Sequence, residues 1–313
     1  MSRAYGWNAQ LLIAEESEYG VMPDTGYRKI PFISSSLDSE QNLLSSNVLG
    51  LGRDPTQPFQ DVINVDGDMA VPVDVRNIGV WLKAIFGEPT TTEADGVYTH
   101  AFESGKIAIP SYSLEVGLPE VPQFIRFLGV RANSIAFNFQ RSGEAQVTLN
   151  LMAQCEKGST TAIDAAPDVY KYTRVSQFQG YIKSGGEFLA NITAASATYS
   201  NNLEKIETIR NDGLVEAIDL GVASLSGSIS ARYGDNILLD KAREGTPVDV
   251  ELGYQLTDTM KLVIECHEVY LPKPKRSIDG PNGIECSYDF QGAKSEELGH
   301  MMTIKLINDV ESY

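Results

Sequence analysis

The sequence has few of the residues on which catalytic and metal sites are usually built. It contains three cysteines and three histidines in 313 residues, and no two cysteines have Cys-x-x-Cys spacing. An odd number of separated cysteines indicates reduced side chains in a reducing compartment rather than a disulfide framework or a zinc site. No His-Glu-x-x-His, Walker A or Gly-x-Ser-x-Gly sequence occurs. We therefore expect no catalytic residue, no metal and no cofactor.

Basic residues are also scarce. Lys and Arg number 25 against 42 Asp and Glu, which gives a formal net charge of −17. Binding to phosphates needs clustered Lys and Arg, so this balance argues against a protein that grips nucleic acid. The one basic cluster is Lys273-Pro274-Lys275-Arg276. It is either a solvated loop tip or a contact for an acidic surface of a neighbouring copy.

Long hydrophobic runs are missing. No stretch approaches 18 consecutive apolar residues, so we expect no membrane span. The first 20 residues contain too few apolar side chains in a row for a signal-peptide core. These absences favour a protein made in the cytoplasm.

The remaining candidates for chemistry are weak. Cys266 and His267 are adjacent in an expected strand, where neighbouring side chains point to opposite faces and cannot share a metal. The acidic pairs Glu15-Glu16 and Glu296-Glu297 are expected to be solvated. Trp7 and Trp81 are expected to be core anchors rather than ligand platforms.

What the sequence does contain is β-strand patterning, best developed between Val130 and Ala153. Apolar and polar residues alternate on both sides of a short turn at Gly143, which predicts a two-faced β-hairpin. Further strands are expected at residues 10–15, 30–37, 61–73, 97–102 and 111–116, with a polar loop at 90–96. One helix is expected from Val75 to Phe86, with Asp74 as N-cap and Gly87 as the stop signal. The stretch from Asn47 to Phe59 contains two glycines and two prolines and predicts a long irregular segment.

The second half of the chain repeats the order of elements in the first half. Gly67 and Gly227, Glu115 and Glu251, and Gln140 and Gln291 occupy similar positions, at offsets of 160, 136 and 151 residues. We assign insertions to residues 90–106 and 273–283, and a second closing hairpin to residues 284–307. The expected domains are 1–156 and 173–313, joined by a linker at 157–172.

Several segments and the closing hairpin together form an ordered set: Glu15-Glu16-Ser17-Glu18-Tyr19-Gly20-Val21-Met22-Pro23, residues 30–37, 82–87, 97–102 and 111–117. This set resembles the tail tube (major tail) proteins of long-tailed bacteriophages. The resemblance covers most of residues 10–155 and is looser over residues 175–308. It implies a mainly β fold of tandem tail-tube-type β-sandwich or half-barrel units, each with one flanking α-helix. Six units would close into a ring with a central β-barrel.

The resemblance also implies partners and a location. Most family members form hexameric rings of one-domain subunits, whereas this chain is long enough for two units. We therefore expect three chains per ring, with a hexamer as the alternative. Rings would stack into a virion tail tube through which DNA passes without being bound. The tape measure, tail terminator and distal tail proteins would be further partners.

Two sets of residues are predicted to carry this function. Polar residues of the two expected hairpins are candidates for lining the channel: Asn138, Gln146, Thr148, Asn150, Glu285, Asp289, Thr303 and Lys305. Residues of the irregular segment are candidates for the contact between stacked rings: Asn47, Leu49, Leu51, Arg53 and Phe59.

Two alternatives remain open. A β-sandwich that binds or hydrolyses carbohydrate would show exposed aromatic side chains near two carboxylates. Another tail or injection-tube component, such as a terminator or the inner tube of a contractile system, would share the β fold.

Overall fold

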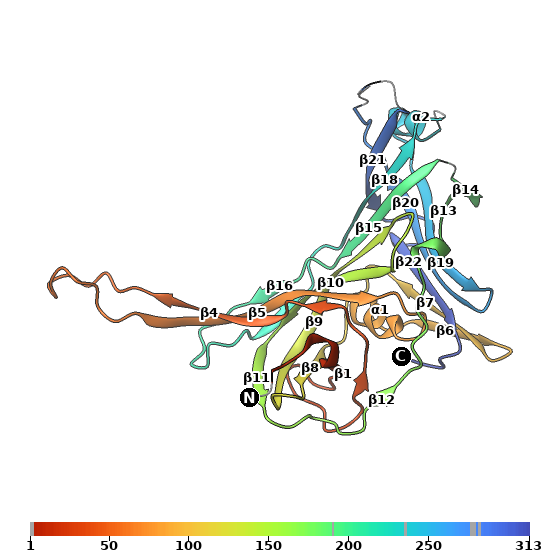
Figure 1. The fold of residues 1–313 in the computed structure, drawn as a ribbon. Helices are drawn as coiled ribbons and strands as arrows, with labels where there is room; N and C mark the ends of the chain where they lie inside the picture. The colour runs from red at the N-terminus through yellow and green to blue at the C-terminus, as the bar shows by residue number, and fades with distance from the viewer. Residues whose placement is uncertain (1–2, 190, 235–236, 276–279, 281–282) are drawn as a thin grey trace.

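The computed structural model describes residues 3–189, 191–234, 237–275, 280 and 283–313 (Figure 1). A long antiparallel sheet, here called the long sheet, runs through the whole body. From one edge to the other its strands are β3 (Ser34–Ser35) and β4 (Asp38–Leu44), β5 (Phe59–Pro72), β10 (Gln146–Ala153), the C-terminal part of β9 (Gln123–Phe139), β15 (Ile192–Ser200), β18 (Ser224–Arg232) and β21 (Glu285–Ala293).

A second sheet packs against the buried face of the long sheet. Its order is β14 (Glu187–Phe188), β13 (Gly180–Ser184), β19 (Val248–Thr257), β20 (Met260–Tyr270), β22 (Met302–Asn308), β7 (Val97–Glu103) and β6 (Thr90–Ala94). The end of β20 also pairs with β21, so the two sheets are joined at one corner. The rings of Phe139 and Tyr254 stack between the layers with centroids 4.5 Å apart.

A smaller group of strands extends from the N-terminal part of β9. It contains β11 (Cys155–Ser159), β8 (Tyr112–Leu118), β1 (Gln10–Glu15), β2 (Arg28–Lys29) and the short parallel β12 (Asp168–Val169). Separate short elements are β16 (Glu204–Ile206), β17 (Ala217–Asp219) and the 3-10 turns η1 (Gly6–Asn8) and η2 (Gln177–Gln179).

The buried carboxylate of Glu16 organises this smaller group. It accepts hydrogen bonds from the hydroxyls of Ser111 and Ser113 at 2.7 Å and from the backbone N–H groups of Gly20 and Gly129 at 2.9 and 2.8 Å. Four donors compensate the cost of burying an acidic group. The prediction that Glu16 belongs to a solvated face is therefore wrong, whereas Glu15 is partly exposed and pairs with Lys83.

The helix α1 (Ile78–Phe86) is buried over all nine residues. The Asp74 carboxylate accepts the N–H of Arg76 at 2.8 Å, and the Asp74 carbonyl accepts that of Ile78 at 2.9 Å, so Asp74 caps the turn just before the helix. Gly87 ends the helix with a positive φ of 79°, as its glycine predicts. By contrast, α2 (Ile237–Glu244) buries only Leu238 and Leu239.

The two halves of the chain share one pairing scheme. Ser34–Ala70 and Asp38–Asp66 are opposed in the first half, and Ala194–Ser230 and Thr198–Ser226, each 160 positions later, are opposed in the second. The β8–β9 and β19–β20 pairs also correspond, with the same register shift after Tyr112 and after Val248, 136 positions later. Two of the three predicted offsets, 160 and 136, thus agree with the strand registers.

The third predicted offset is wrong. β21 and β22 do not pair with each other, so residues 284–307 form no hairpin. β21 lies between β18 and β20, as β10 lies between β5 and β9, and Gln291 corresponds to Met152 rather than to Gln140. The alternating pattern was correct, but period-2 patterning does not reveal which strand is the partner. The segment 294–301 between β21 and β22, rather than 273–283, therefore carries the extra length.

Other expectations also need correction. Residues 90–96 are not a loop, because Asp95 and Gly96, both with positive φ, form the two-residue turn of the β6–β7 hairpin. Parts of the expected linker 157–172 lie in β11 and β12, which pair with strands of the first half. One hydrophobic core contains residues from both halves. Trp81 is buried, but Trp7 is 82% exposed and anchors no core.

Candidate functional site

One face of the long sheet is open and lined by small polar side chains; we call it the polar face. Register pairs connect its residues across the strands, from Asp68 and Ala70 on β5 to Asp289 and Gln291 on β21. The residues between them are Thr148, Asn150, Ser134, Ala136, Asn138, Ser196, Thr198, Ser226 and Ser228. Val147, Phe137, Tyr199 and other apolar residues alternate with them and form the opposite, buried face.

The polar face is nearly free of charge. Its members include two carboxylates, Asp68 and Asp289, and no Lys or Arg. The Ser196 and Ser228 hydroxyls are 3.0 Å apart, and Asn150 Nδ2 donates to Asp68 Oδ1 at 2.8 Å. Much of the hydrogen-bonding capacity is thus satisfied within the surface. Such a surface offers no cluster of cations to hold a polyanion.

Six of the eight residues predicted to line a channel lie on or beside this face. Asn138, Thr148, Asn150 and Asp289 are members of it. Gln146 and Glu285 lie further along β10 and β21, on the same side of each strand as the members. Thr303 and Lys305 do not belong to it, because β22 lies in the second sheet. Thr303 is buried, and Lys305 pairs with Glu265 at 2.6 Å. A single lining made of all eight residues is therefore wrong.

The hairpin of β4 and β5 projects from the body as a long arm (Figure 1). The five predicted contact residues Asn47, Leu49, Leu51, Arg53 and Phe59 are all exposed on it. The predicted irregular segment 47–59 forms no strand up to residue 58, whereas Phe59 already begins β5. Leu49 is 93% exposed and Leu51 is 65% exposed. An exposed cluster of large apolar side chains on a protruding arm is typical of a contact surface.

The equivalent connection in the second half, residues 201–223, is folded back instead. It contains β16 and β17 and a small core of Leu203, Val215 and Ile218, against which Met152 of β10 packs. Lys205 Nζ lies 2.7 Å from Asp66 Oδ2 of the first half. Sequence reasoning missed this segment, because its strands are only three residues long.

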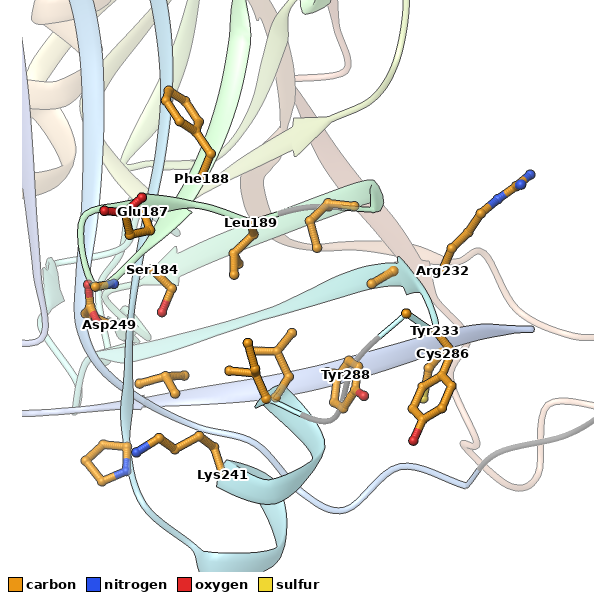
Figure 2. Close-up of a pocket in the computed structure, with 18 residues that line it drawn as sticks. Ser184, Glu187, Phe188, Leu189, Arg232, Tyr233, Lys241, Asp249, Cys286 and Tyr288 are labelled. Carbon is orange, nitrogen blue, oxygen red and sulfur yellow. The ribbon is translucent and has the colours of Figure 1, made fainter. Parts of the chain in front are cut away.

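A groove of about 440 Å³ lies beside α2 (Figure 2). Its walls are mainly apolar and include Leu189, Leu238 and Val248. Two carboxylates, Glu187 and Asp249, line the groove, and Asp249 accepts the backbone N–H of Gly185 at 2.8 Å. Phe188, Tyr233 and Tyr288 also line the groove.

The cysteine and histidine residues form no metal centre within the described residues. Cys266 is fully buried, and burial raises the pKa of its thiol to about 12. His267 lies on the opposite side of the strand, as predicted, and shares the Thr303 hydroxyl with His300 at 2.7 and 2.8 Å. Burial and the neighbouring His300 lower the pKa of His267. These contacts describe a structural cluster between β20 and β22.

Neither helix of the described part of the chain has the length and apolarity needed to cross a membrane. A comparison with protein families finds a match over residues 6–292, to the family described as "Phage tail tube protein". No curated protein matches the sequence.

Proposed function

Because the chain belongs to the phage tail tube protein family, and is thus a structural protein of the virion tail, we propose that its copies close into rings whose inner wall is the polar face. The observation that carries this proposal is the continuous polar face across β5, β10, β9, β15, β18 and β21, whose named members are mostly small polar side chains with two carboxylates and no Lys or Arg. DNA would slide along such a wall, because it finds neither clustered cations nor an apolar surface.

The shared pairing scheme supports three chains per ring. Each half contributes the same order of strands to the long sheet, so one chain supplies two tube-wall units and three chains supply six. The alternative is a ring of six chains. A closed ring would also remove the open edges of the long sheet, which otherwise invite uncontrolled pairing.

Electron microscopy of the purified protein tests this function. Rings or tubes with a central channel are the expected result, and the number of chains in class averages separates three from six. A protein that stays monomeric and binds sugars would contradict the proposal.

The arm supports a second contact, between stacked rings. Deleting residues 45–58 should leave a folded chain that forms rings but no tubes, since none of the deleted residues is buried and none belongs to a strand. A milder variant, Leu49→Ser with Leu51→Ser, should act in the same direction.

A matched control places the same change on exposed apolar residues elsewhere. Ile107 and Val169 are 98% and 67% exposed, and Ile107→Ser with Val169→Ser should leave tube formation unchanged. Tubes of normal length from the arm deletion would show that the arm does not join rings.

A further inference from the structure

The joint between the two halves of one chain provides a template for the joint between two chains. Inside the chain, the C-terminal part of β9 pairs with β15. Ala136 lies opposite Thr198, and Ser134 lies opposite Ser200. This is the point at which the long sheet passes from the first half to the second.

The second half contains a counterpart of β9 that has no such partner. Val269 and Tyr270 of β20 occupy the positions of Val130 and Arg131, 139 residues earlier, as the paired strands show. The following residue, Leu271, is 5% exposed, like its counterpart Ala132 at 2%. Lys273 and Lys275 thus correspond to Ser134 and Ala136. Residues 271–275 are not in a strand, and no described strand pairs with Glu285–Phe290 on that edge of β21.

The first half contains a counterpart of β15 that likewise lacks an outer partner. β3 and the start of β4 correspond to β15 at the offset of 160, so Asp38 and Glu40 occupy the positions of Thr198 and Ser200. Within the described residues, no strand pairs with the outer edge of β4. The backbone N–H of Ser39 donates to the Glu156 carboxylate at 3.1 Å.

We infer that the edge of β3 and β4 in one copy pairs antiparallel with residues 271–275 of a second copy, with Asp38 opposite Lys275 and Glu40 opposite Lys273. The register follows directly from the Thr198–Ala136 and Ser200–Ser134 pairs of the internal joint. All four charged side chains are exposed, and none forms an ion pair within the described part of the chain. Each predicted pair joins opposite charges, which stabilises directly opposed residues in a sheet.

The prolines of this segment are compatible with the joint. Pro272 and Pro274 are two residues apart, so their missing N–H groups fall on the same edge of the extended segment. The other edge keeps the donors of Lys273 and Lys275. The edge of the segment that carries Pro272 and Pro274 therefore forms fewer backbone hydrogen bonds. The two ion pairs offset part of that loss.

The contrast between the two helices supports the same partner. In the first half, Tyr199 stacks on Phe86 of α1 with ring centroids 4.7 Å apart, and Asn201 Nδ2 donates to the Ile85 carbonyl at 2.9 Å. Tyr199 lies near the end of β15, and Asn201 directly follows that strand. In the second half, α2 lacks this cover and the groove of Figure 2 lies beside it. A second copy joined through β4 would place Ser39 and Gln41 of that strand, the counterparts of Tyr199 and Asn201, at this groove.

Engineered disulfides test the register directly. Directly opposed residues in an antiparallel pair have Cα atoms about 4.5–5.5 Å apart, which suits a disulfide, whereas diagonal neighbours are about 7–8 Å apart. Under mild oxidation, Asp38→Cys with Lys275→Cys should give a covalent ring, read as a ladder on a non-reducing gel. Glu40→Cys with Lys275→Cys is the diagonal control and should cross-link at least tenfold less. The three native cysteines are free and buried.

Charge exchange tests the ion pairs. Lys273→Glu with Lys275→Glu should reduce ring formation at least tenfold, and adding Asp38→Lys with Glu40→Lys should restore it. Lys171→Glu with Lys294→Glu changes the net charge equally at exposed positions and should have no effect.

The inference rests on the ring proposed above, and the outcomes separate the two. If the wild-type chain forms rings but the diagonal cysteine pair cross-links best, or neither pair cross-links, the joint is wrong and the ring stands. If the wild-type chain forms no ring in electron micrographs, the proposed function fails and the joint with it.

Discussion

The two halves of this chain have the same strand order. They differ in the elements that pair with, or pack on, a strand of the other half. In the first half, β9 is 17 residues long and its C-terminal part pairs with β15. In the second half, the corresponding β20 ends at Tyr270 and residues 271–275 are not in a strand. The connection after β15 is folded onto the first half, whereas the connection after β4 is an exposed arm.

These differences have a common physical reason. An extended segment is a stable strand only when its backbone groups and one face of its side chains find partners. Each first-half element that borders the second half has its partner in the same chain. Among the residues that the structure describes, the elements at the two outer ends lack a partner strand, which is the pattern expected when the missing partner belongs to another copy.

The largest effect is expected at two equivalent glycines. A Cβ atom at Gly67 would lie 2.4 Å from the Ser36 carbonyl oxygen, and one at Gly227 would lie 2.1 Å from the Ser196 carbonyl oxygen. Because both contacts are with backbone, Gly67→Ala and Gly227→Ala should each lower the free energy of unfolding by about 3 kcal/mol, the upper end for overpacked sites. Urea denaturation measures this.

Gly158 provides the control for these substitutions, since nothing lies within 4 Å of a Cβ there. Gly158→Ala should change stability by less than about 0.5 kcal/mol, as for most surface substitutions. If only one of the two glycines is sensitive, the close crossing of strands is not a shared feature of both halves.

A smaller effect on stability is expected at Gly79 of α1, where the C-terminal Tyr313 packs on the helix. The sign of this effect should depend on whether Tyr313 is present. The Tyr313 ring covers Gly79 of α1, its hydroxyl donates to the Arg76 carbonyl at 2.7 Å, and Lys83 Nζ donates to the Tyr313 main-chain oxygen at 2.8 Å. A Cβ at Gly79 would lie 2.2 Å from a ring carbon. Gly79→Ala should therefore destabilise the chain by about 1–3 kcal/mol, through overpacking.

In a Tyr313→Ala background, the same Gly79→Ala change should stabilise the chain by up to about 1 kcal/mol, the helix preference for alanine. The double-mutant cycle is read by urea denaturation. Additive effects would mean that Tyr313 does not cover the helix in solution.

The smallest effect concerns pH. Burial lowers the pKa of His100 below its ordinary value of 6.5, and its Nε2 lies 2.8 Å from the Val310 carbonyl oxygen, where the two halves meet. Below pH 6.5 the unfolded chain binds the proton more readily than the folded chain. Stability should therefore fall as the pH drops from 6.5 towards the lower pKa of the folded state.

Between about pH 7.5 and 5.5 we expect a loss on the order of 1 kcal/mol. His100→Gln should reduce this loss, and His267→Gln in the second half should do so too, since burial also lowers the pKa of His267. Urea denaturation at several pH values measures both. An unchanged pH dependence in both variants would contradict the role of the buried histidines.

Local features of the fold were predictable from the sequence. The strand Gln10–Glu15 was predicted with the observed bounds, and the helix was placed correctly at its C-terminal end by Gly87. The hairpin of Phe137 and Val147 was also correct. These features depend on side-chain periodicity and on residues close together in the sequence, which are the interactions a single sequence displays.

Features that depend on distant residues were predicted less well. The residues of β21 and β22 showed the correct alternation, but β21 pairs with β18 and β20, and β22 pairs with β20 and β7, rather than the two pairing with each other. Trp7 looked like a core residue by its type, but it lies in the 3-10 turn η1 and is exposed. Glu16 looked solvated but is buried. Four donors, one each from Gly20, Ser111, Ser113 and Gly129, bind its carboxylate and compensate for the loss of water.

By itself, the sequence determined a β-rich chain in two similar halves, with an acidic surface and no motif for catalysis or metal binding. The tertiary structure decided that the halves share one core, that small polar residues of six strands meet on one face, and that basic and acidic segments are left at opposite outer edges. The reason is that strand pairing joins residues far apart in the chain. Alternation selects the face of each strand, but only the assembled sheet selects its neighbours.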